Sequence, residues 1–384
     1  MKYYLIAGEA SGDLHGSNLI LEIKKRDHNA SFRGWGGDLM RGAGAEIVKD
    51  YRDLAFMGFT EVIRNLPTIL QNIKFCKSDI LQYKPDTVIF IDYPGFNLRI
   101  AEWAHKNGLK TIYYISPQVW AWKESRVKTI RKNIDKMLVI LPFEKAFFQK
   151  WNFETDYVGH PLVEVIGQFK KSPQAKTLPE IFTAAGKQEN QTRPLIALLP
   201  GSRKQEILKK LPVMLAASID FPEYQFIVAE APGQESAFYD EILKDYPNAG
   251  RVRNQTYNLL QHAEAACVTS GTATLETALF RVPEVICYKG SSISYQIAKR
   301  LIKVKYISLV NLIMDKPVVK ELIQDEMNAK NITAELKKLL SDGSNRERLF
   351  KDYDELRLIL SQGGNASEKA AALIVDMLSG PSVS

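Results

Sequence analysis

Short apolar runs alternate with longer helical stretches along most of the chain, and this alternation constrains the fold more than any other feature. Each run leads into Gly, Pro, Ser or Asp, as in YYLIAGEASGD, TVIFIDYPGFN, TIYYISPQ, MLVILPFE, PLIALLPGSR, YQFIVAEAPG, ACVTSGTA and PEVICYK. Continuously apolar runs separated by helices are typical of parallel sheets, whose two faces are both covered. The sequence therefore predicts an α/β protein built from doubly wound parallel sheets.

The length of the chain indicates two such domains. It has 384 residues, and a domain takes roughly 150 residues. The segment 167–194 is polar and contains three prolines, so we expect the boundary there. The predicted domains are residues 1–166 and 167–361, with a C-terminal helix at about 362–384 that packs back onto the first domain.

Several classes of protein are excluded by missing patterns. The three cysteines, Cys76, Cys267 and Cys287, are widely spaced and form no C-x-x-C pair. That spacing argues against a disulfide framework or a zinc cluster and favours a reduced, cytosolic compartment. No run of about 18 apolar residues is present, which argues against a spanning helix. The dinucleotide, P-loop, serine hydrolase and zinc protease motifs are also absent, so we expect neither a cofactor nor a metal.

The positive charge of the chain lies in its first part. Residues 1–150 hold 23 Lys and Arg against 16 Asp and Glu, and residues 151–384 hold 28 against 28, so the formal excess of +7 falls before residue 151. This asymmetry favours an anionic partner for the first domain. A lysine-rich solvated surface is the alternative interpretation.

The segment CVTSGTATLETALF, residues 267–280, has the pattern of a strand that turns into a helix. A helix beginning near Thr272 would point the N–H groups of Gly271–Thr274 at a ligand, and a diphosphate suits them. Ser270 and Ala273 belong to this turn, and Glu276 is placed to accept hydrogen bonds from a ribose. The segment contains no lysine. The alternative is an ordinary helix start in which Glu276 complements the dipole.

A second turn of the same kind lies in LIALLPGSRKQEI. It places Gly201, Ser202 and Arg203 after a predicted strand, and the five donors of an arginine match phosphate oxygens. Together the two turns are able to hold a nucleoside diphosphate without lysine or metal. A surface arginine at the start of a basic helix is the alternative.

The first domain offers a carboxylate at the end of a strand. Asp92 directly follows VIFI, where it is able to take a proton from an incoming hydroxyl that Asn97 orients. The alternative is an aspartate that caps the turn DYPGFN. The segment GEASGD supplies Glu9, Ser11 and Asp13 on what reads as a flexible loop able to close on a polar ligand. The lone histidines His15 and His160 are interpreted as structural.

Two further segments of the first domain concern its partner. Residues 66–81, LPTILQNIKFCKSDIL, have Leu66, Ile69, Leu70, Ile73 and Ile80 at helical spacing near Lys74 and Lys77, after the apolar LAFMGFTEVI. Core packing of an amphipathic helix is the default interpretation, and the alternative is a surface for acyl chains or a membrane. Residues 116–136 combine two tryptophans with basic residues. That composition suits a sugar phosphate or a headgroup; it also resembles an RNA-binding composition, but no RNA-binding signature accompanies it.

In order along the chain, AGEASGD, FMGFTEV, IDYPGFN, YYISPQVWAWKESRV, LPFE, VGHP, LLPGSR and TSGTATLE resemble the lipid-A-disaccharide synthase family. The resemblance implies an inverting, metal-independent glycosyltransferase with the GT-B fold, two Rossmann-like domains facing a cleft. It would act at the cytoplasmic face of the inner membrane of Gram-negative bacteria. The implied substrates are UDP-2,3-diacylglucosamine and 2,3-diacylglucosamine 1-phosphate, joined by a β-1,6 linkage with release of UDP.

The resemblance also implies roles for individual residues. Asp92 would be the general base, Arg203, Ser270–Ala273 and Glu276 would bind UDP, and Asn311 would lie on the donor side. An anionic membrane surface is implied as a partner, nucleic acid is not, and a homodimer is left open. Two alternatives remain, a UDP-sugar 2-epimerase of the same fold and a non-catalytic peripheral membrane or nucleic-acid binder.

Overall fold

The computed structural model describes residues 1–54, 66–122, 124–173, 175–187, 189, 192–290, 304–341 and 343–380. The chain divides into two compact units, Met1–Pro161 with Leu360–Ser384, and Leu162–Ile359. The divisions lie a few residues from the boundaries expected from the sequence. Apart from its first residue, Leu54, the apolar segment LAFMGFTEVI lies outside the described residues.

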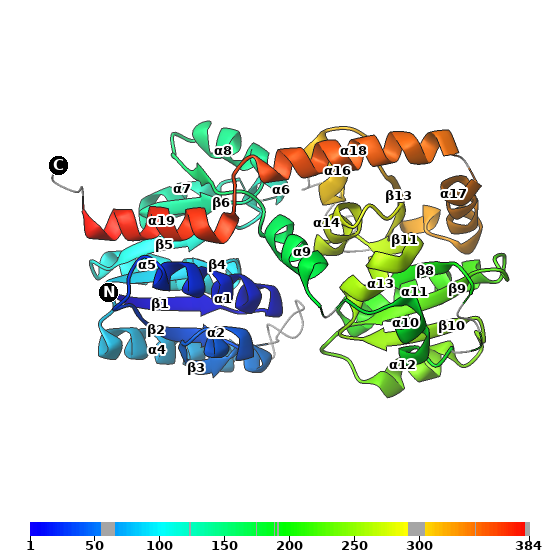
Figure 1. Ribbon diagram of the computed structural model, residues 1–384. Helices are drawn as coiled ribbons and strands as arrows, with labels where there is room; N and C mark the ends of the chain where they lie inside the picture. The colour runs from blue at the N-terminus through cyan, green and yellow to red at the C-terminus, as the bar shows by residue number, and fades with distance from the viewer. Residues whose placement is uncertain are drawn as a thin grey trace. The chain divides into compact units, whose positions relative to one another are not determined.

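The first unit is a seven-stranded parallel sheet with helices on both faces (Figure 1), in the strand order β3-β2-β1-β4-β5-β6-β7. Its elements are β1 (Lys2–Ala7), α1 (Ala10–Lys24), β2 (Ser31–Gly36), α2 (Asp38–Gly42), β3 (Glu46–Asp50), η1 (Tyr51–Leu54), α4 (Leu66–Tyr83), β4 (Thr87–Ile91), α5 (Pro94–Lys106), β5 (Lys110–Tyr114), α6 (Val119–Trp122), α7 (Arg126–Asn133), β6 (Lys136–Val139), α8 (Pro142–Gln149), β7 (Asp156–Tyr157) and α19 (Ala366–Ser379).

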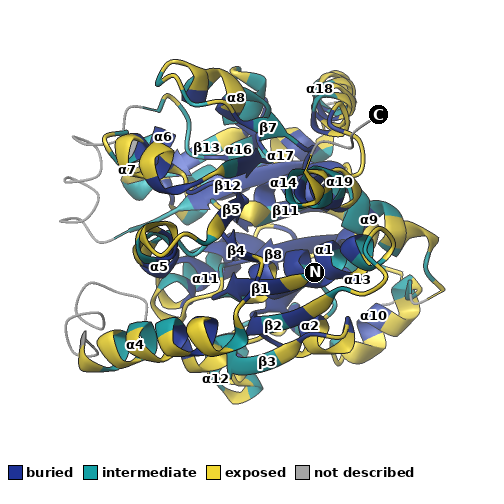
Figure 2. Cartoon of the chain, turned by 90° about the vertical axis from the view of Figure 1, so that its left-hand side faces the viewer, coloured by how far each residue is buried: buried dark blue, intermediate teal, exposed yellow. Residues whose placement is uncertain are grey.

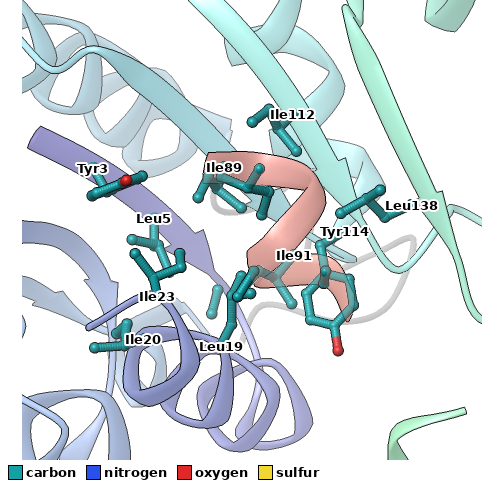
Figure 3. Packing of buried hydrophobic residues seen from close by; sticks show 14 of the residues in the cluster. Tyr3, Leu5, Leu19, Ile20, Ile23, Ile89, Ile91, Ile112, Tyr114 and Leu138 are labelled. Carbon is teal, nitrogen blue, oxygen red and sulfur yellow. The ribbon is translucent and has the colours of Figure 1, made fainter. Parts of the chain in front are cut away.

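Alternate residues of the central strands β1, β4 and β5 fill two separate cores, which explains why these strands read as unbroken apolar runs. On one face Leu5, Ile89 and Ile112 pack with α1 and α19 (Figure 3). The next residue of each strand points to the other face. There Ile6, which follows Leu5, and Phe90, which follows Ile89, pack with residues of α4, α5 and α7. Each face therefore needs a helical layer, and the strands between the two layers are buried (Figure 2).

The second unit repeats this architecture with a six-stranded parallel sheet in the order β10-β9-β8-β11-β12-β13. Its elements are α9 (Pro161–Lys171), α10 (Leu178–Ala184), β8 (Leu195–Leu199), α11 (Lys204–Ser218), β9 (Gln225–Glu230), α12 (Ser236–Leu243), β10 (Ala249–Arg253), α13 (Thr256–His262), β11 (Ala263–Thr269), α14 (Thr272–Leu279), β12 (Glu284–Tyr288), α16 (Leu309–Met314), β13 (Lys320–Ile323), η3 (Gln324–Glu326), α17 (Ala329–Ser341) and α18 (Gly343–Ser361).

The C-terminal helix α19 belongs to the first unit although it follows the second in sequence. Ala366, Ala370, Ala371 and Ile374 are buried in the core shared with α1. No helix within the described ranges combines the length and the apolar character needed to cross a membrane.

Candidate functional site

Each sheet contains a point where the order of the strands reverses. From β1 the chain proceeds to β2 and β3 on one side and then returns to β4 on the other, and β8 and β11 are related in the same way. Ligands of open α/β sheets bind outside the carboxyl ends of the strands at such a point. The turns that follow β1, β4, β8 and β11 are the turns that carry most of the predicted site residues.

Asp92 directly follows β4 in an unusual backbone conformation. Its φ is 45° and that of Tyr93 is 50°, so two successive residues that are not glycine adopt the left-handed region. Each such residue costs on the order of 1 kcal/mol or more, and this kind of strain concentrates at functional sites. The conformation is held by hydrogen bonds to the Asp92 carbonyl oxygen from the Tyr113 hydroxyl at 2.6 Å and from Asn97 Nδ2 at 2.7 Å.

The carboxyl group of Asp92 is half-buried. Burial, together with the negative charge of Glu9, raises its pKa to about 7, and a hydrogen bond from the Tyr93 N–H partly opposes the shift. A pKa near the working pH suits a general base, because the group is then both available and strong.

Asn97 has a different role from the one that the sequence suggested. Its side chain is fully buried, and Nδ2 donates to the carbonyl oxygens of Ile6 and Ile91, each at 3.3 Å, as well as to that of Asp92. These bonds tie the ends of β1 and β4 together. Asn97 therefore stabilises the Asp92 turn from the protein interior and does not contact a substrate.

The segment from Glu9 to Asp13 is the start of a helix and not a flexible loop. Glu9 is the N-cap residue of α1, and Ser11 lies exposed in its first turn. Asp13 is 3% exposed. Its carboxylate accepts hydrogen bonds from the N–H groups that begin α2, those of Gly37, Leu39 and Met40. Asp13 is thus a buried cap, and Glu9 and Ser11 remain near the strand ends.

We expect Asp13→Ala to lower the free energy of unfolding by about 1–3 kcal/mol, because buried N–H groups lose their acceptor. Asp38→Ala is the matched control, since Asp38 begins α2 but its side chain is 64% exposed and pairs with Arg41 and Arg52 at the surface. Urea unfolding followed by circular dichroism measures both changes. Equal losses in the two variants would contradict the buried cap.

In the second unit, β8 leads into the turn Gly201–Arg203 as predicted, and α11 begins at Lys204. Gly201 has a φ of +113°, and a Cβ there would lie 2.7 Å from Glu206 Oε2, so the position requires glycine. The side chain of Arg203 is 58% exposed, and its Nη1 lies 3.7 Å from Glu206 Oε1.

The second turn joins β11 to α14, which begins at Thr272 as predicted. Gly271 and Thr272 are exposed, and Ala273 is half-buried. The Ser270 hydroxyl donates to the Ile307 carbonyl oxygen at 2.8 Å, which anchors the turn. The Thr274 N–H donates to the Gly271 carbonyl oxygen at 3.2 Å, so the amides available to a ligand are fewer than the predicted set.

Glu276 lies in α14 beside Tyr257, whose hydroxyl donates to Oε1 at 3.0 Å. Burial raises the pKa of Glu276, and the hydrogen bond from Tyr257 partly offsets this. The carboxyl group is therefore held in one orientation near the turn, as a contact to a ribose would require.

Asn311 lies in α16, where its side chain is committed to internal hydrogen bonds. Nδ2 donates to the Val319 carbonyl oxygen at 2.9 Å and to Glu321 Oε1 at 3.0 Å, and Oδ1 accepts from the Val319 N–H at 2.9 Å. Asn311 also lines a cavity of about 480 Å³ together with Glu284 and Lys320, the first residues of β12 and β13. This cavity lies at the amino ends of the strands, the edge opposite the two turns.

Sequence reasoning missed Lys210. It lies in the helix that the alternative interpretation of Arg203 took as basic, but its side chain is only 4% exposed and its Nζ lies 3.7 Å from Glu206 Oε2. Nζ also donates to Thr269 Oγ1 at the end of β11. The helical spacing could have indicated that Lys210 is buried. It follows the buried Ile207 by three residues and precedes the buried Met214 by four, so the three share one face of the helix.

Comparison with known proteins supports one family over the whole chain. A family model described as Lipid-A-disaccharide synthetase matches residues 3–375. The lipid-A-disaccharide synthase of Syntrophus aciditrophicus is 40% identical over 380 residues, covering 97% of each chain. That of Geobacter metallireducens is 39% identical over 382 residues, covering 97% of this chain and 96% of the relative.

Similarity to solved structures is confined to the fold. The UDP-GlcNAc 2-epimerase from Neisseria meningitidis, bound to UDP-GlcNAc, superposes with a TM-score of 0.67 at 12% identity, covering 99% of this chain and 100% of its own. The calicheamicin glycosyltransferase CalG4 gives a TM-score of 0.59 at 16% identity, covering 100% of this chain and 99% of its own. The prediction of a GT-B fold with two parallel-sheet, Rossmann-like domains is confirmed.

Proposed function

The chain belongs to the lipid-A-disaccharide synthase family and is a glycosyltransferase of lipid A biosynthesis, and from this premise we propose a reaction and the residues that perform it. The protein transfers 2,3-diacylglucosamine from its UDP derivative to 2,3-diacylglucosamine 1-phosphate, forming a β-1,6 bond and UDP. The observation that carries the residue assignment is the pair of switch points, with Asp92 at one and the Arg203 and Ser270 turns at the other.

The acceptor reacts at the first switch point. Its 6-hydroxyl oxygen attacks the anomeric carbon of the donor sugar, the bond from that carbon to the diphosphate oxygen breaks, and the hydroxyl proton passes to the Asp92 carboxylate. Because its pKa is raised to about 7, Asp92 is a stronger base than an ordinary aspartate and is still substantially ionised near neutral pH. Inversion follows from attack opposite the departing diphosphate.

The donor is held at the second switch point. The diphosphate lies against the start of α14, where backbone N–H groups and the helix dipole favour negative charge. Arg203 supplies charge-assisted hydrogen bonds, which strengthen as charge develops on the departing UDP. Glu276, oriented by Tyr257, receives the ribose hydroxyls.

The test of this proposal supplies both lipid substrates in mixed micelles and detects the disaccharide by mass spectrometry. We expect disaccharide 1-phosphate and UDP in equal amounts. An epimerase would convert the UDP-sugar without joining two sugars, and consumption of the donor without disaccharide would overturn the proposal. The epimerase alternative is not favoured, because the relatives at 39–40% identity are named synthases, whereas the epimerase superposed above is 12% identical.

The lipid substrates call for a surface that meets the membrane, and we assign this surface to α4, with the protein peripheral on the cytoplasmic face of the inner membrane. Ile73 and Ile80 of α4 face the core of the first unit, so they are not part of this surface. Leu70 and Leu81 are 54% and 55% exposed. They follow helical spacing with Lys74 and Lys77, and Figure 2 shows exposed residues along this helix.

We expect the protein to float with phosphatidylglycerol vesicles at low salt and to dissociate from them at high salt. Each basic residue at an anionic surface contributes about 1 kcal/mol to the free energy of membrane binding. Replacing both Leu70 and Leu81 with serine should weaken flotation. The control is Leu208→Ser, which removes an apolar side chain that is 49% exposed in the second unit. Equal flotation with zwitterionic vesicles, or an equal loss in the control, would remove α4 from the proposal.

A further inference from the structure

The two turns of the second unit share a buried lysine that belongs to neither sequence motif. Lys210 comes from the second turn of α11, and its Nζ donates to Thr269 Oγ1 at the carboxyl end of β11. Thr269 Oγ1 in turn lies 3.4 Å from the Cys287 carbonyl oxygen on β12. The ammonium group is thus fixed directly beneath the turn that begins at Ser270.

Glu206 connects this lysine to Arg203. One carboxylate oxygen, Oε1, lies 3.7 Å from Arg203 Nη1, and the other, Oε2, lies 3.7 Å from Lys210 Nζ. Gly201 suits the arrangement, because its φ of +113° strains any other residue and a Cβ there would lie 2.7 Å from Oε2. The glycine of the turn and the carboxylate of the helix therefore fit each other.

The charges of Arg203, Glu206 and Lys210 together determine whether the turn attracts an anion. Arg203 and Lys210 are each positive and Glu206 is negative, so the trio carries a net charge of +1. Without Lys210, Glu206 would neutralise Arg203, and the trio would carry none. Burial lowers the pKa of Lys210, and the adjacent Glu206 carboxylate opposes that shift and favours the charged form.

We propose that Lys210 is a positioning residue for the donor diphosphate: it balances the charge of Glu206 and so keeps the trio of Arg203, Glu206 and Lys210 net positive toward the phosphates. It takes the place of the lysine that phosphate-binding turns usually carry in their own sequence. The inference rests on the proposed function, because it presumes that a nucleoside diphosphate binds at these turns.

The test measures the affinities of the full-length protein for UDP and for uridine by calorimetry. Lys210→Met keeps the length and the apolar stem of the side chain but removes the charge. We expect UDP to bind roughly tenfold more weakly, as for the loss of one charge-assisted interaction, and uridine to bind unchanged because it has no phosphate. Lys209→Met is the matched control, since Lys209 is exposed, and it should leave both affinities unchanged.

A second variant distinguishes charge balance from simple damage to the fold. Glu206→Gln combined with Lys210→Met returns the trio to a net charge of +1, so UDP affinity should recover toward that of the wild type. Equal losses for UDP and uridine, or no recovery in the double variant, would overturn the inference and leave the proposed function intact. Failure of the wild type to bind UDP would overturn both.

Discussion

Asp92→Asn should reduce turnover by about 10²- to 10⁴-fold, the usual contribution of a general base, while UDP affinity stays within about twofold of the wild type. Asparagine has the size and polarity of aspartate but does not take up a proton, and the donor turns lie in the other unit of the chain. Steady-state kinetics measure the first quantity and calorimetry the second. Turnover near that of the wild type would leave Asp92 as a turn residue only.

The pH dependence supplies a control that keeps the base in place. Asp92 acts only when it is ionised, so with its pKa raised to about 7 the value of kcat/KM should rise with pH through neutrality and then level off. Glu9→Gln removes the negative charge that helps to raise this pKa, so the rise should move to lower pH. If the pH profile of kcat/KM were the same in Glu9→Gln as in the wild type, the observed titration would belong to a group other than Asp92.

As the pH rises through 7, the stability that Asp92 contributes to the folded state should fall while the activity rises. The pKa of Asp92 is higher in the folded protein, about 7, than its ordinary value of 3.8. The folded state therefore binds this proton more tightly, and the corresponding stabilisation, complete below about pH 4, is lost as the pH rises through 7. At pH 8 the neutral asparagine avoids the buried charge, so Asp92→Asn should melt no lower than the wild type, which makes inactivity through misfolding easy to exclude.

The central strands of both sheets were predictable from sequence because their signal is local. Each of these strands is an apolar run that ends in turn residues, and the carboxyl ends of parallel strands meet at one edge. Strands nearer the edges, such as β2 (SFRGWG) and β3 (EIVKD), contain charged residues and carry no such run. The two donor turns could therefore be paired across 67 positions, from Arg203 to Ser270, without any knowledge of side-chain contacts. Their strands β8 and β11 are indeed hydrogen-bonded neighbours.

Residues with long-range roles were not predictable in this way. Asp13 follows two small residues that disfavour helix, so the segment reads as a loop, yet Gly12 lets α1 approach Ala7 and Ile91 closely. The partners of Asp13 begin 24 positions later in the chain. Lys210 shows the same limit, because its helical phase indicates burial but the acceptor Thr269 is 59 positions away.

Arg203→Ala should weaken UDP binding by about tenfold to a hundredfold, because hydrogen bonds to a charged group contribute roughly 1.5–3 kcal/mol each and 1.4 kcal/mol is a factor of ten. Calorimetry in the presence of EDTA measures the affinity and shows at once whether it depends on metal. Lys204→Ala is the matched control. It removes the same charge from the next residue, whose Nζ lies over the Phe238 ring at 5.3 Å, and should have little effect.

Arg203→Lys then separates charge from geometry. Lysine keeps the positive charge but has no planar fork to bind two phosphate oxygens at once, so its UDP affinity should fall between those of the wild type and Arg203→Ala. Uridine affinity should be unchanged in all three variants. If uridine binding fell in parallel with UDP binding, Arg203 would act on the nucleoside or on the shape of the turn, and the diphosphate would have to be held by the start of α14 without it.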